Sequence, residues 1–380
     1  MNWLLVFVPV TAGLEVFAPD RYTLVFISSC LAILPLAGWL GRATEQLAAR
    51  LGEGVGGLLN ATFGNAAELI IALVALRAGL YDIVKASIAG SIVGNILLVL
   101  GAAMVAGGWN RPEQHFDPAG ARSQATMLTL AAIALILPAA FQTASGTTVE
   151  GLGRLSVAIS VVLLVVYALY LAFTLVTHSS LFTGSYVPEE KEAAVSVGRA
   201  ATVLALATGG IAWMSEILVG AVEPAAHELG ISDLFVGVFV VALFGNAAEH
   251  ATAITVALKD RMDLSLSIAI GSSVQVALFV APILVLASLL LSSTPMNLAF
   301  RPGLVLIILL SVLITGQIAG DGRSDWLKGV QLLAVYLVLA LTFYFLPGEA
   351  TGSHSYVLSL KDTILKDIIG IFRRGIQKEY

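Results

Sequence analysis

The chain has 380 residues, of which 58% are hydrophobic and only 12% are charged, and its mean hydropathy is +0.93. Soluble domains carry about a quarter charged residues, so this composition indicates an integral membrane protein. The single cysteine, Cys30, excludes a disulfide framework and a thiolate metal site. The formal net charge is −5 and no large basic region is present, so we expect no nucleic-acid partner.

Apolar stretches of about 20 to 25 residues recur along the chain, which is long enough to cross roughly 30 Å of hydrocarbon as helices rather than as barrel strands. The predicted fold class is an all-α integral membrane protein with about eleven transmembrane helices. The expected spans cover residues 2–18, 21–41, 55–79, 84–108, 121–142, 154–178, 197–220, 232–258, 264–292, 300–319 and 327–346. The first span lacks a basic leader and a small-residue cleavage site, so we interpret it as a retained helix rather than a signal peptide.

The distribution of Lys and Arg between alternate loops predicts the orientation. The loops after the even-numbered spans hold Arg42, Arg50, Arg111, Arg122, Lys191, Arg199, Lys259, Arg261, Arg323 and Lys328. The opposite loops hold Arg21, Arg77, Lys85, Arg154 and Arg301. The positive-inside rule then places the first set and the N-terminus in the cytoplasm, and we expect the protein in a prokaryotic cell membrane.

A five-residue motif, GNAAE, occurs twice, at Gly64–Glu68 and at Gly245–Glu249. The shift that aligns the two copies also pairs, without a gap, Asp82 with Asp263, Gly90 with Gly271, and Ser91 with Ser272. The copies lie on the third and eighth expected spans, and an odd separation reverses the direction of crossing. The sequence therefore predicts two inverted five-helix repeats and an extra N-terminal helix, which is a transporter architecture with its site near the membrane midplane.

This repeat divides the chain into five predicted segments. They are an N-terminal transmembrane helix (1–20), a first repeat (21–178), a cytoplasmic linker (179–196), a second repeat (197–346) and a C-terminal tail (347–380). The linker carries Glu189, Glu190 and Glu192, which form either a solvated connection or an ion-sensing segment. Apolar residues recur at helical spacing in the tail, which is either an interfacial amphipathic helix or an artificial extension, and no function is predicted for it.

The repeated carboxylates, Glu68 and Glu249, predict a cation site. A carboxylate at the bilayer centre costs about 2.5 to 3.5 kcal/mol even on a lenient scale, and no basic residue lies in the core of an expected span to pair with it. Asn65 and Asn246 precede the two glutamates by three residues, which would put amide and carboxylate on one helical face. An all-oxygen set of this kind is typical of Ca²⁺, whereas a site without His or Cys clusters does not suit zinc or copper.

The charges of this pair also predict a mechanism. Two neighbouring carboxylates carry −2, and either one Ca²⁺ or two protons neutralise them, so protons compete with the metal. The neutral forms can rearrange in the membrane while the bare −2 form is penalised. This behaviour is that of an antiporter, which is not an enzyme, needs no cofactor, and takes Ca²⁺ and H⁺ as transported ions within the lipid bilayer.

Several further polar residues are candidates for a supporting role. His250 follows Glu249 and either relays protons or is a packed polar residue. Ser91, Asn95, Ser272 and Gln275 either complete the shell around the ion or form hydrogen bonds between helices. Glu45, Glu216 and Glu223 are either acids at an entrance to the site or members of structural pairs.

The residues Leu58–Leu73 and Gly245–Ala251, together with Ser215–Glu223 and Gly271–Phe279, resemble the signature repeats of the Ca²⁺/H⁺ antiporters in the cation/Ca²⁺ exchanger superfamily. The resemblance covers nearly the whole chain to Pro347. It implies an eleven-span fold, a Ca²⁺ site centred on Glu68 and Glu249, and proton-coupled extrusion of Ca²⁺ from the cytosol. It also implies roles for Asn65, Asn246 and His250, and a possible homotrimer. The chain departs from the family pattern at Ala67, where many members have a hydroxyl residue, and at Gly94, where Ser is common.

Three other functions compete with this interpretation. A Na⁺/Ca²⁺ exchanger would be expected to have more anionic or hydroxyl oxygens, whereas Asn95, Gln275 and His250 favour protons. A passive channel usually repeats parallel subunits around a pore, which an inverted duplication does not provide. An intramembrane hydrolase would need a zinc-ligand helix or a nucleophile elbow, and the sequence has neither.

Overall fold

The computed structural model describes residues 2–51, 53–144, 146–178, 196–292 and 294–346. In this part of the chain, eight helices are long and apolar enough to cross a membrane, and the number rises to nine if one bent pair counts as a single span. The predicted helical membrane fold is therefore confirmed, and the count of eleven spans stays a prediction. The acidic cluster of the linker and the C-terminal tail lie outside the described residues.

The first half of the chain contains a short N-terminal helix, a series of long helices and one very short strand. Their bounds are η1 (Asn2–Val6), α1 (Phe7–Phe17), α2 (Tyr22–Leu51), α3 (Glu53–Phe63), α4 (Ala66–Arg77), α5 (Tyr81–Val93), η2 (Gly94–Val99), α6 (Leu100–Gly108), β1 (Gln114–His115), α7 (Pro118–Gln142), α8 (Val149–Ala172) and η3 (Phe173–Thr177). Of these, η2 and η3 are π-helical turns that continue α5 and α8.

The second half repeats this order. Its elements are α9 (Val197–Leu229), α10 (Asp233–Phe235), η5 (Val236–Val241), α11 (Ala242–Gly245), α12 (Ala247–Leu258), α13 (Met262–Gln275), η6 (Val276–Val280), α14 (Ala281–Leu291), α15 (Pro302–Ala319), β2 (Arg323–Ser324) and α16 (Trp326–Tyr344). Strands β1 and β2 pair in antiparallel fashion, with Gln114 opposite Ser324, and are a small exception to the all-α expectation.

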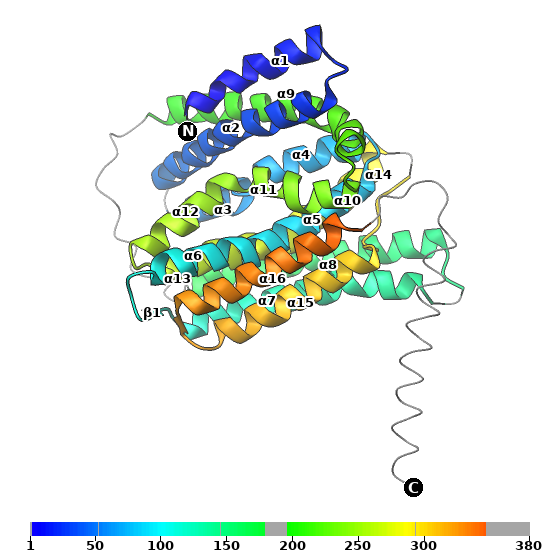
Figure 1. The fold of residues 1–380 in the computed structure, drawn as a ribbon. Helices are drawn as coiled ribbons and strands as arrows, with labels where there is room; N and C mark the ends of the chain where they lie inside the picture. Colours follow the sequence, from blue (N-terminus) through cyan, green and yellow to red (C-terminus); the bar gives the residue numbers. More distant parts are fainter. Residues whose placement is uncertain (1, 52, 145, 179–195, 293, 347–380) are drawn as a thin grey trace.

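The long helices pack as two groups (Figure 1). Helices α2 and α9 lie side by side along their length, and α1 packs against α2. The larger group contains α5, α6, α13 and α14 at its centre, with α7, α8, α15 and α16 around them. Helices α4 and α12, which carry the two copies of the motif, run in opposite directions. The structure thus has the arrangement of inverted repeats.

The third and eighth expected spans are not continuous helices. The first is interrupted at Gly64 and Asn65, between α3 and α4, and the second at Asn246, between α11 and α12. The second break bends the chain by 63°. Asn65 and Glu68 are therefore not in the interior of a continuous span, as expected, because Asn65 stands at the interruption as the N-cap residue of α4 and Glu68 lies in the first turn beyond it. The same correction holds for Asn246 and Glu249.

Polar side chains at the end of one repeat hold a loop of the other repeat. Lys85 is buried in α5 rather than exposed in a loop, and its Nζ donates hydrogen bonds to Asn297 Oδ1 and Ala299 O at 2.8 Å each. Arg301, at the start of α15, forms an ion pair with Asp82 at 2.7 Å. At the opposite end, Asp263 is the repeat partner of Asp82, and it accepts a hydrogen bond from the backbone N–H of Asp117. These contacts tie the two repeats together at both ends of the bundle.

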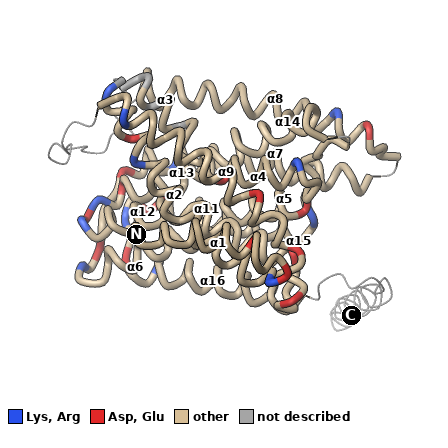
Figure 2. The backbone as a smooth tube through the Cα atoms, turned by 90° about the horizontal axis from the view of Figure 1, so that it is seen from above, with Lys and Arg blue, Asp and Glu red and all other residues tan. Residues whose placement is uncertain are grey.

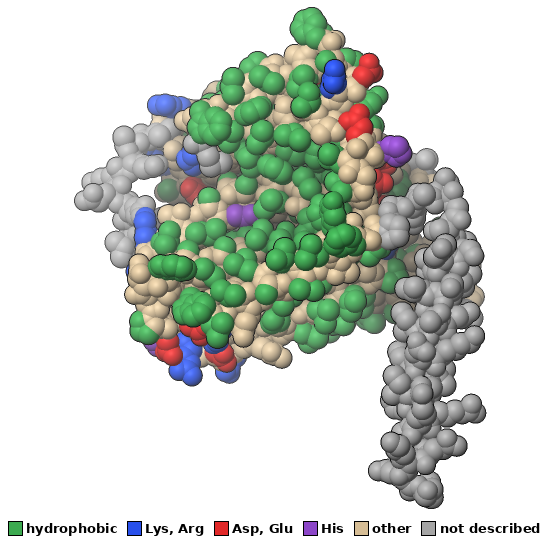
Figure 3. All heavy atoms as spheres, in the orientation of Figure 1, with side chains coloured by type: hydrophobic (Ala, Val, Ile, Leu, Met, Phe, Trp, Pro, Cys, Tyr) green, Lys and Arg blue, Asp and Glu red, His purple; other side chains and the backbone are tan. Residues whose placement is uncertain are grey.

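The surface has the distribution expected of a membrane protein. Apolar side chains cover most of the face seen in Figure 3, where the charged side chains lie toward its margins. In the perpendicular view of Figure 2, basic and acidic residues gather at the two ends of the helices and the middle is almost entirely uncharged. The apolar band between the two charged ends is the part that faces lipid.

Helices α5 and η5 approach each other as closely as backbone allows. A Cβ atom added to Gly90 would lie 2.2 Å from the carbonyl oxygen of Val238, so only glycine fits at this position. The contact joins the first repeat to the broken helix of the second.

This contact predicts the effect of one added methyl group. Gly90→Ala must push two backbones apart, and we expect it to destabilise the protein by about 1 to 3 kcal/mol. Gly220→Ala, in α9, meets nothing within 4 Å and is expected to be neutral or slightly stabilising. Thermal unfolding of the two variants in detergent measures the difference, and equal unfolding temperatures would contradict the close packing.

Candidate functional site

Glu68 and Glu249 occupy equivalent places in the two repeats, each in the first turn of the helix that follows a break. Glu68 is only 6% exposed, and Glu249 is partly exposed. A helix N-terminus favours a carboxylate because its N–H groups carry partial positive charge. The end of the preceding helix, α3 or α11, brings backbone carbonyls to the same point, and these favour a cation. Each break therefore provides groups that suit both an anionic side chain and a bound cation.

The asparagines at the two breaks are turned away from their own helices. Asn65 and Asn246 hold the N-cap positions of α4 and α12, where an asparagine side chain normally accepts a hydrogen bond from the first turn. Neither makes that bond. Instead Ser272 Oγ donates to Asn65 Oδ1 at 2.9 Å, and Asn246 Nδ2 donates to Ser91 Oγ at 3.0 Å. Each asparagine thus pairs with the serine of the other repeat.

The glutamates cross over in the same way. A Cβ atom at Gly245 would lie 3.2 Å from Cγ and 3.4 Å from Oε1 of Glu68, and one at Gly64 would lie 3.6 Å from Oε1 of Glu249. Each carboxylate therefore packs against the glycine of the opposite motif, and the two acidic side chains are close enough to interact electrostatically. A Cβ atom at Gly245 would crowd the side chain of Glu68, and one at Gly64 would lie 2.8 Å from the backbone carbonyl oxygen of Asn60, so both positions favour glycine.

Residues without a repeat counterpart form a hydrogen-bonded chain on one side of the glutamates. His250 Nε2 contacts Asn95 Oδ1 at 3.1 Å, and Asn95 Nδ2 donates to Ser272 Oγ at 3.0 Å. Ser272 lies next to Glu249 and continues the chain to Asn65. The alignment of the two motifs pairs His250 with Leu69 and Asn95 with Val276, so the symmetry-related counterpart of this contact is apolar. The site is symmetric in its acids and asymmetric in its supporting groups.

Gln275 also reaches the site, because its Oε1 would lie 3.5 Å from a Cβ atom at Gly64. The π-helical turns η2 and η6 begin at Gly94 and Val276, directly beyond the polar residues of α5 and α13. Such turns interrupt the regular helical hydrogen bonds and occur frequently at functional sites. The sequence reasoning identified these polar residues but did not predict the change of helix type.

Several polar atoms in this cluster are buried and lack a hydrogen-bond partner within the described residues. They are Asn246 Oδ1, Glu249 Oε2 and Asn65 Nδ2. Such atoms are rare in folded proteins unless a ligand or an ion completes them. In the described ranges no group of three or more His, Cys, Asp or Glu side chains is positioned to hold a metal ion. The available ligands are two carboxylates with amide, hydroxyl and backbone oxygens, a set that suits Ca²⁺.

Three of the acids predicted for the supporting shell lie elsewhere. Glu45, Glu216 and Glu223 are exposed on α2 and α9. Glu216 is 3.9 Å from Arg77, so its place is a surface ion pair, and Glu45 also has a partner. The structure adds Tyr336 of α16, which lies with Asn246 and His250 around a narrow gap. Nothing in the surroundings of Tyr336 in the sequence distinguishes it from other tyrosines.

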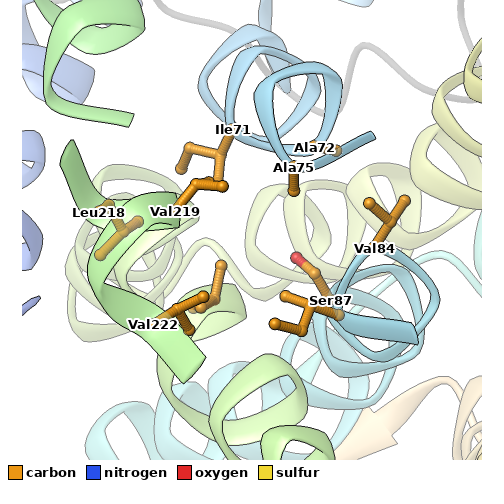
Figure 4. Close-up of a pocket in the computed structure, with 10 residues that line it drawn as sticks. Ile71, Ala72, Ala75, Val84, Ser87, Leu218, Val219 and Val222 are labelled. Atoms are coloured by element: carbon orange, nitrogen blue, oxygen red, sulfur yellow. The ribbon is translucent and has the colours of Figure 1, made fainter. Parts of the chain in front are cut away.

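The packing differs between the two sides of the glutamates. Toward the C-terminal end of α4, side chains of α4, α5 and α9 converge, with Ile71, Val84 and Val219 among them (Figure 4). The cavity left between them is only about 10 Å³, which is too small for a hydrated ion. Among the residues labelled in Figure 4, only Ser87 has a polar side chain. On the other side of the site, the last turns of α3 expose Leu58, Asn60 and Thr62. The bundle is therefore tightly packed between α4, α5 and α9 and more exposed beside α3.

Comparison with known proteins relates the whole chain to one family of transporters. The family described as sodium/calcium exchanger protein matches residues 21–176 and 199–345. The chain is 45% identical to a Ca²⁺/H⁺ antiporter of Aphanothece halophytica, over 90% of this chain and 96% of that protein. It is 42% identical to the Ca²⁺/H⁺ antiporter ChaA of Bacillus subtilis, over 85% and 92% of the two chains.

Solved structures show the same relationship. The structure of native YfkE has a TM-score of 0.77 and 37% identity, and the match covers 90% of this chain and all of that chain. The H⁺/Ca²⁺ exchanger CAX, at 17% identity and a TM-score of 0.65, shares the fold.

The crossed hydrogen bonds predict unequal roles for the two serines. Ser272→Ala leaves both Asn95 Nδ2 and Asn65 Oδ1 without their bonds, whereas Ser91→Ala removes one bond from an amide that also donates to Ala242 O. Each buried polar atom left unpaired costs about 1 to 3 kcal/mol, so Ser272→Ala should lower the unfolding temperature more than Ser91→Ala. Thermal unfolding without divalent cations tests this order, and an equal or reversed effect would contradict the hydrogen-bonded chain.

Proposed function

This chain belongs to the sodium/calcium exchanger family, and on that premise we propose that it is an antiporter that exchanges Ca²⁺ for protons across the membrane. The observation that carries the proposal is the facing pair of Glu68 and Glu249, each packed against the other repeat's glycine. The names of the relatives with 45% and 42% identity support the same ions.

In this proposal the two carboxylates are the principal ligands of Ca²⁺. Asn246 Oδ1 and Glu249 Oε2 have no partner among the described residues, so both oxygens are free to contact a cation. Flipping the Asn65 amide would exchange its nitrogen for an oxygen and make the two asparagines equivalent. Ser91, Ser272, Asn95 and Gln275 would hold these ligands in place through the hydrogen bonds described above.

Proton coupling follows from the charge of the pair. In a site of low polarity, two carboxylates without a cation repel each other and are poorly solvated. One Ca²⁺ or two protons remove the net charge, so the two occupants exclude each other and either one permits the site to move. His250 and Asn95 contact the site on one side only, and we assign them the path by which protons reach it.

We assign transport to alternating access, and we assign this structure to the state that opens to the cytoplasm. The positive-inside rule puts the start of α3 on the cytoplasmic side, where Leu58 is 52% exposed. The opposite path, between α4, α5 and α9, is closed by apolar side chains. To open it, α9 must separate from α4 and α5, and closure beside α3 must follow. In this proposal the N-terminus lies in the cytoplasm of a prokaryotic cell.

Glu68→Gln and Glu249→Gln test the assignment of the pair. Each variant removes one of the two charges that balance a buried divalent cation, so transport should fall by about 100-fold or more. The measurement is ⁴⁵Ca²⁺ uptake into proteoliposomes that carry an imposed pH gradient, with Na⁺ absent. Glu150→Gln is the matched control, because Glu150 is exposed and pairs with Arg154 far from the site.

The same assay separates the competing functions. Uptake that follows the pH gradient and collapses with nigericin and K⁺ supports proton exchange. Uptake that ignores the pH gradient and appears with a Na⁺ gradient would make the protein a Na⁺/Ca²⁺ exchanger. Undiminished uptake by both glutamine variants would remove the site assignment.

Competition between the two ions predicts a dependence on pH. The glutamates must lose their protons to hold Ca²⁺, so Ca²⁺ binding should weaken as the pH falls. About two protons should leave for each Ca²⁺ bound. Isothermal titration calorimetry in buffers of different ionisation enthalpy counts these protons, and a value near zero would contradict the shared site.

A further inference from the structure

A second pocket lies between α2 and α9, well away from the glutamates. It has a volume of about 270 Å³ and is lined by Trp39, Arg42, Ala43, Gln46, Arg199 and Val203. We propose that this pocket binds the phosphate group of an anionic phospholipid, with one of the lipid's acyl chains lying along α9.

The positive charge of the two arginines that line the pocket favours an anionic ligand. Arg42 and Arg199 come from two different helices and line the same cavity. In the part of the chain that the structure describes, neither guanidinium has a hydrogen-bond or ion-pair partner. Gln46 adds a further donor to the lining. A guanidinium group presents paired N–H donors that match phosphate oxygens, and two of them on one cavity can hold a phosphodiester from both sides.

The position of the pocket along α2 and α9 favours a lipid as the anionic ligand. Arg42 directly follows the apolar stretch of α2, and Trp39 lies one turn deeper. Tryptophan side chains gather at the boundary between hydrocarbon and headgroups. The positive-inside rule assigns this end of α2 and α9 to the cytoplasmic leaflet, where anionic lipids meet basic pockets between helices. The two arginines are therefore at the depth of lipid phosphates.

The surface below the pocket suits an acyl chain. Val203 and Leu206 follow Arg199 by four and seven residues and so lie on the same side of α9. Val203 lines the pocket, and Leu206 is 69% exposed. A basic site that continues into an exposed apolar strip fits a phosphate with a hydrocarbon chain attached, whereas inorganic phosphate would gain nothing from the strip. This difference favours the lipid over the free anion.

Binding of lipids to the full-length protein in detergent tests the proposal. Native mass spectrometry with phosphatidylglycerol and with phosphatidylcholine should show tighter binding of the anionic lipid. Arg42→Gln and Arg199→Gln should each weaken the phosphatidylglycerol complex by about fivefold, the effect of one basic residue near an anionic lipid surface. Arg50→Gln removes the same charge from the same helix two turns beyond Arg42, and it should bind as the wild type does.

Four results would overturn the proposal. The first three are equal binding of the two lipids, unchanged binding in the Arg42→Gln/Arg199→Gln double variant, and an equal loss in Arg50→Gln. Displacement of phosphatidylglycerol by millimolar inorganic phosphate would show that the pocket recognises a free anion and not a lipid. The double variant Arg42→Lys/Arg199→Lys keeps the charge without the paired donors, and an intermediate affinity is expected from it. Because lipid binding is read directly, the result does not depend on transport activity.

Discussion

The fold is organised around the cost of holding two carboxylates inside an apolar helical bundle. Among the described residues, neither Glu68 nor Glu249 has a basic partner within the site, so each is stabilised by what the opposite repeat supplies. Backbone from a helix break, an unsubstituted glycine and a serine–asparagine pair meet at each acid. The broken helices, the glycines and the crossed hydrogen bonds therefore serve one requirement. Two acidic side chains must be stabilised inside an apolar bundle without a permanent basic partner.

The site contains residues that are matched between the two repeats and residues that are not, and the two sets supply different groups. The paired residues present oxygens from both halves, as a cation needs. The residues His250, from the second repeat, and Asn95, from the first, form a polar contact where their repeat counterparts are the apolar Leu69 and Val276. The packing is asymmetric too, because α9 packs tightly on α4 and α5 while α3 leaves polar side chains exposed. An inverted pair of repeats can hold one half closed and the other open, and exchanging their conformations reverses the direction of access.

Much of this could be predicted from the sequence, because burial of a repeated carboxylate is expensive wherever the chain places it. Hydropathy located the helices, and aligning the two motifs identified the asparagines, serines and glutamates of the site. In the structure each asparagine bonds to the serine of the other repeat. The features that the sequence did not predict concern the surroundings of individual residues. Asn65 and Glu68 looked like residues within one continuous helix, since periodicity cannot show that a helix ends just before Asn65 and that a new one begins after it. Glu216 was a candidate for an entrance acid or a structural pair, and only the structure shows that it lies at the surface beside Arg77. Lys85 looked exposed because its partners, Asn297 and Ala299, belong to the other repeat and lie far along the chain.

The exchange of partners between the repeats also constrains how such a protein could have arisen. Asn65 is satisfied by Ser272 and Asn246 by Ser91, so a single repeat on its own would leave its asparagine and serine unmatched. A half-length ancestor with one motif would have needed a second copy inserted in the opposite orientation to complete either pair. Fusion of the two genes would then fix that orientation, and a fused chain can keep a histidine in one half without the other.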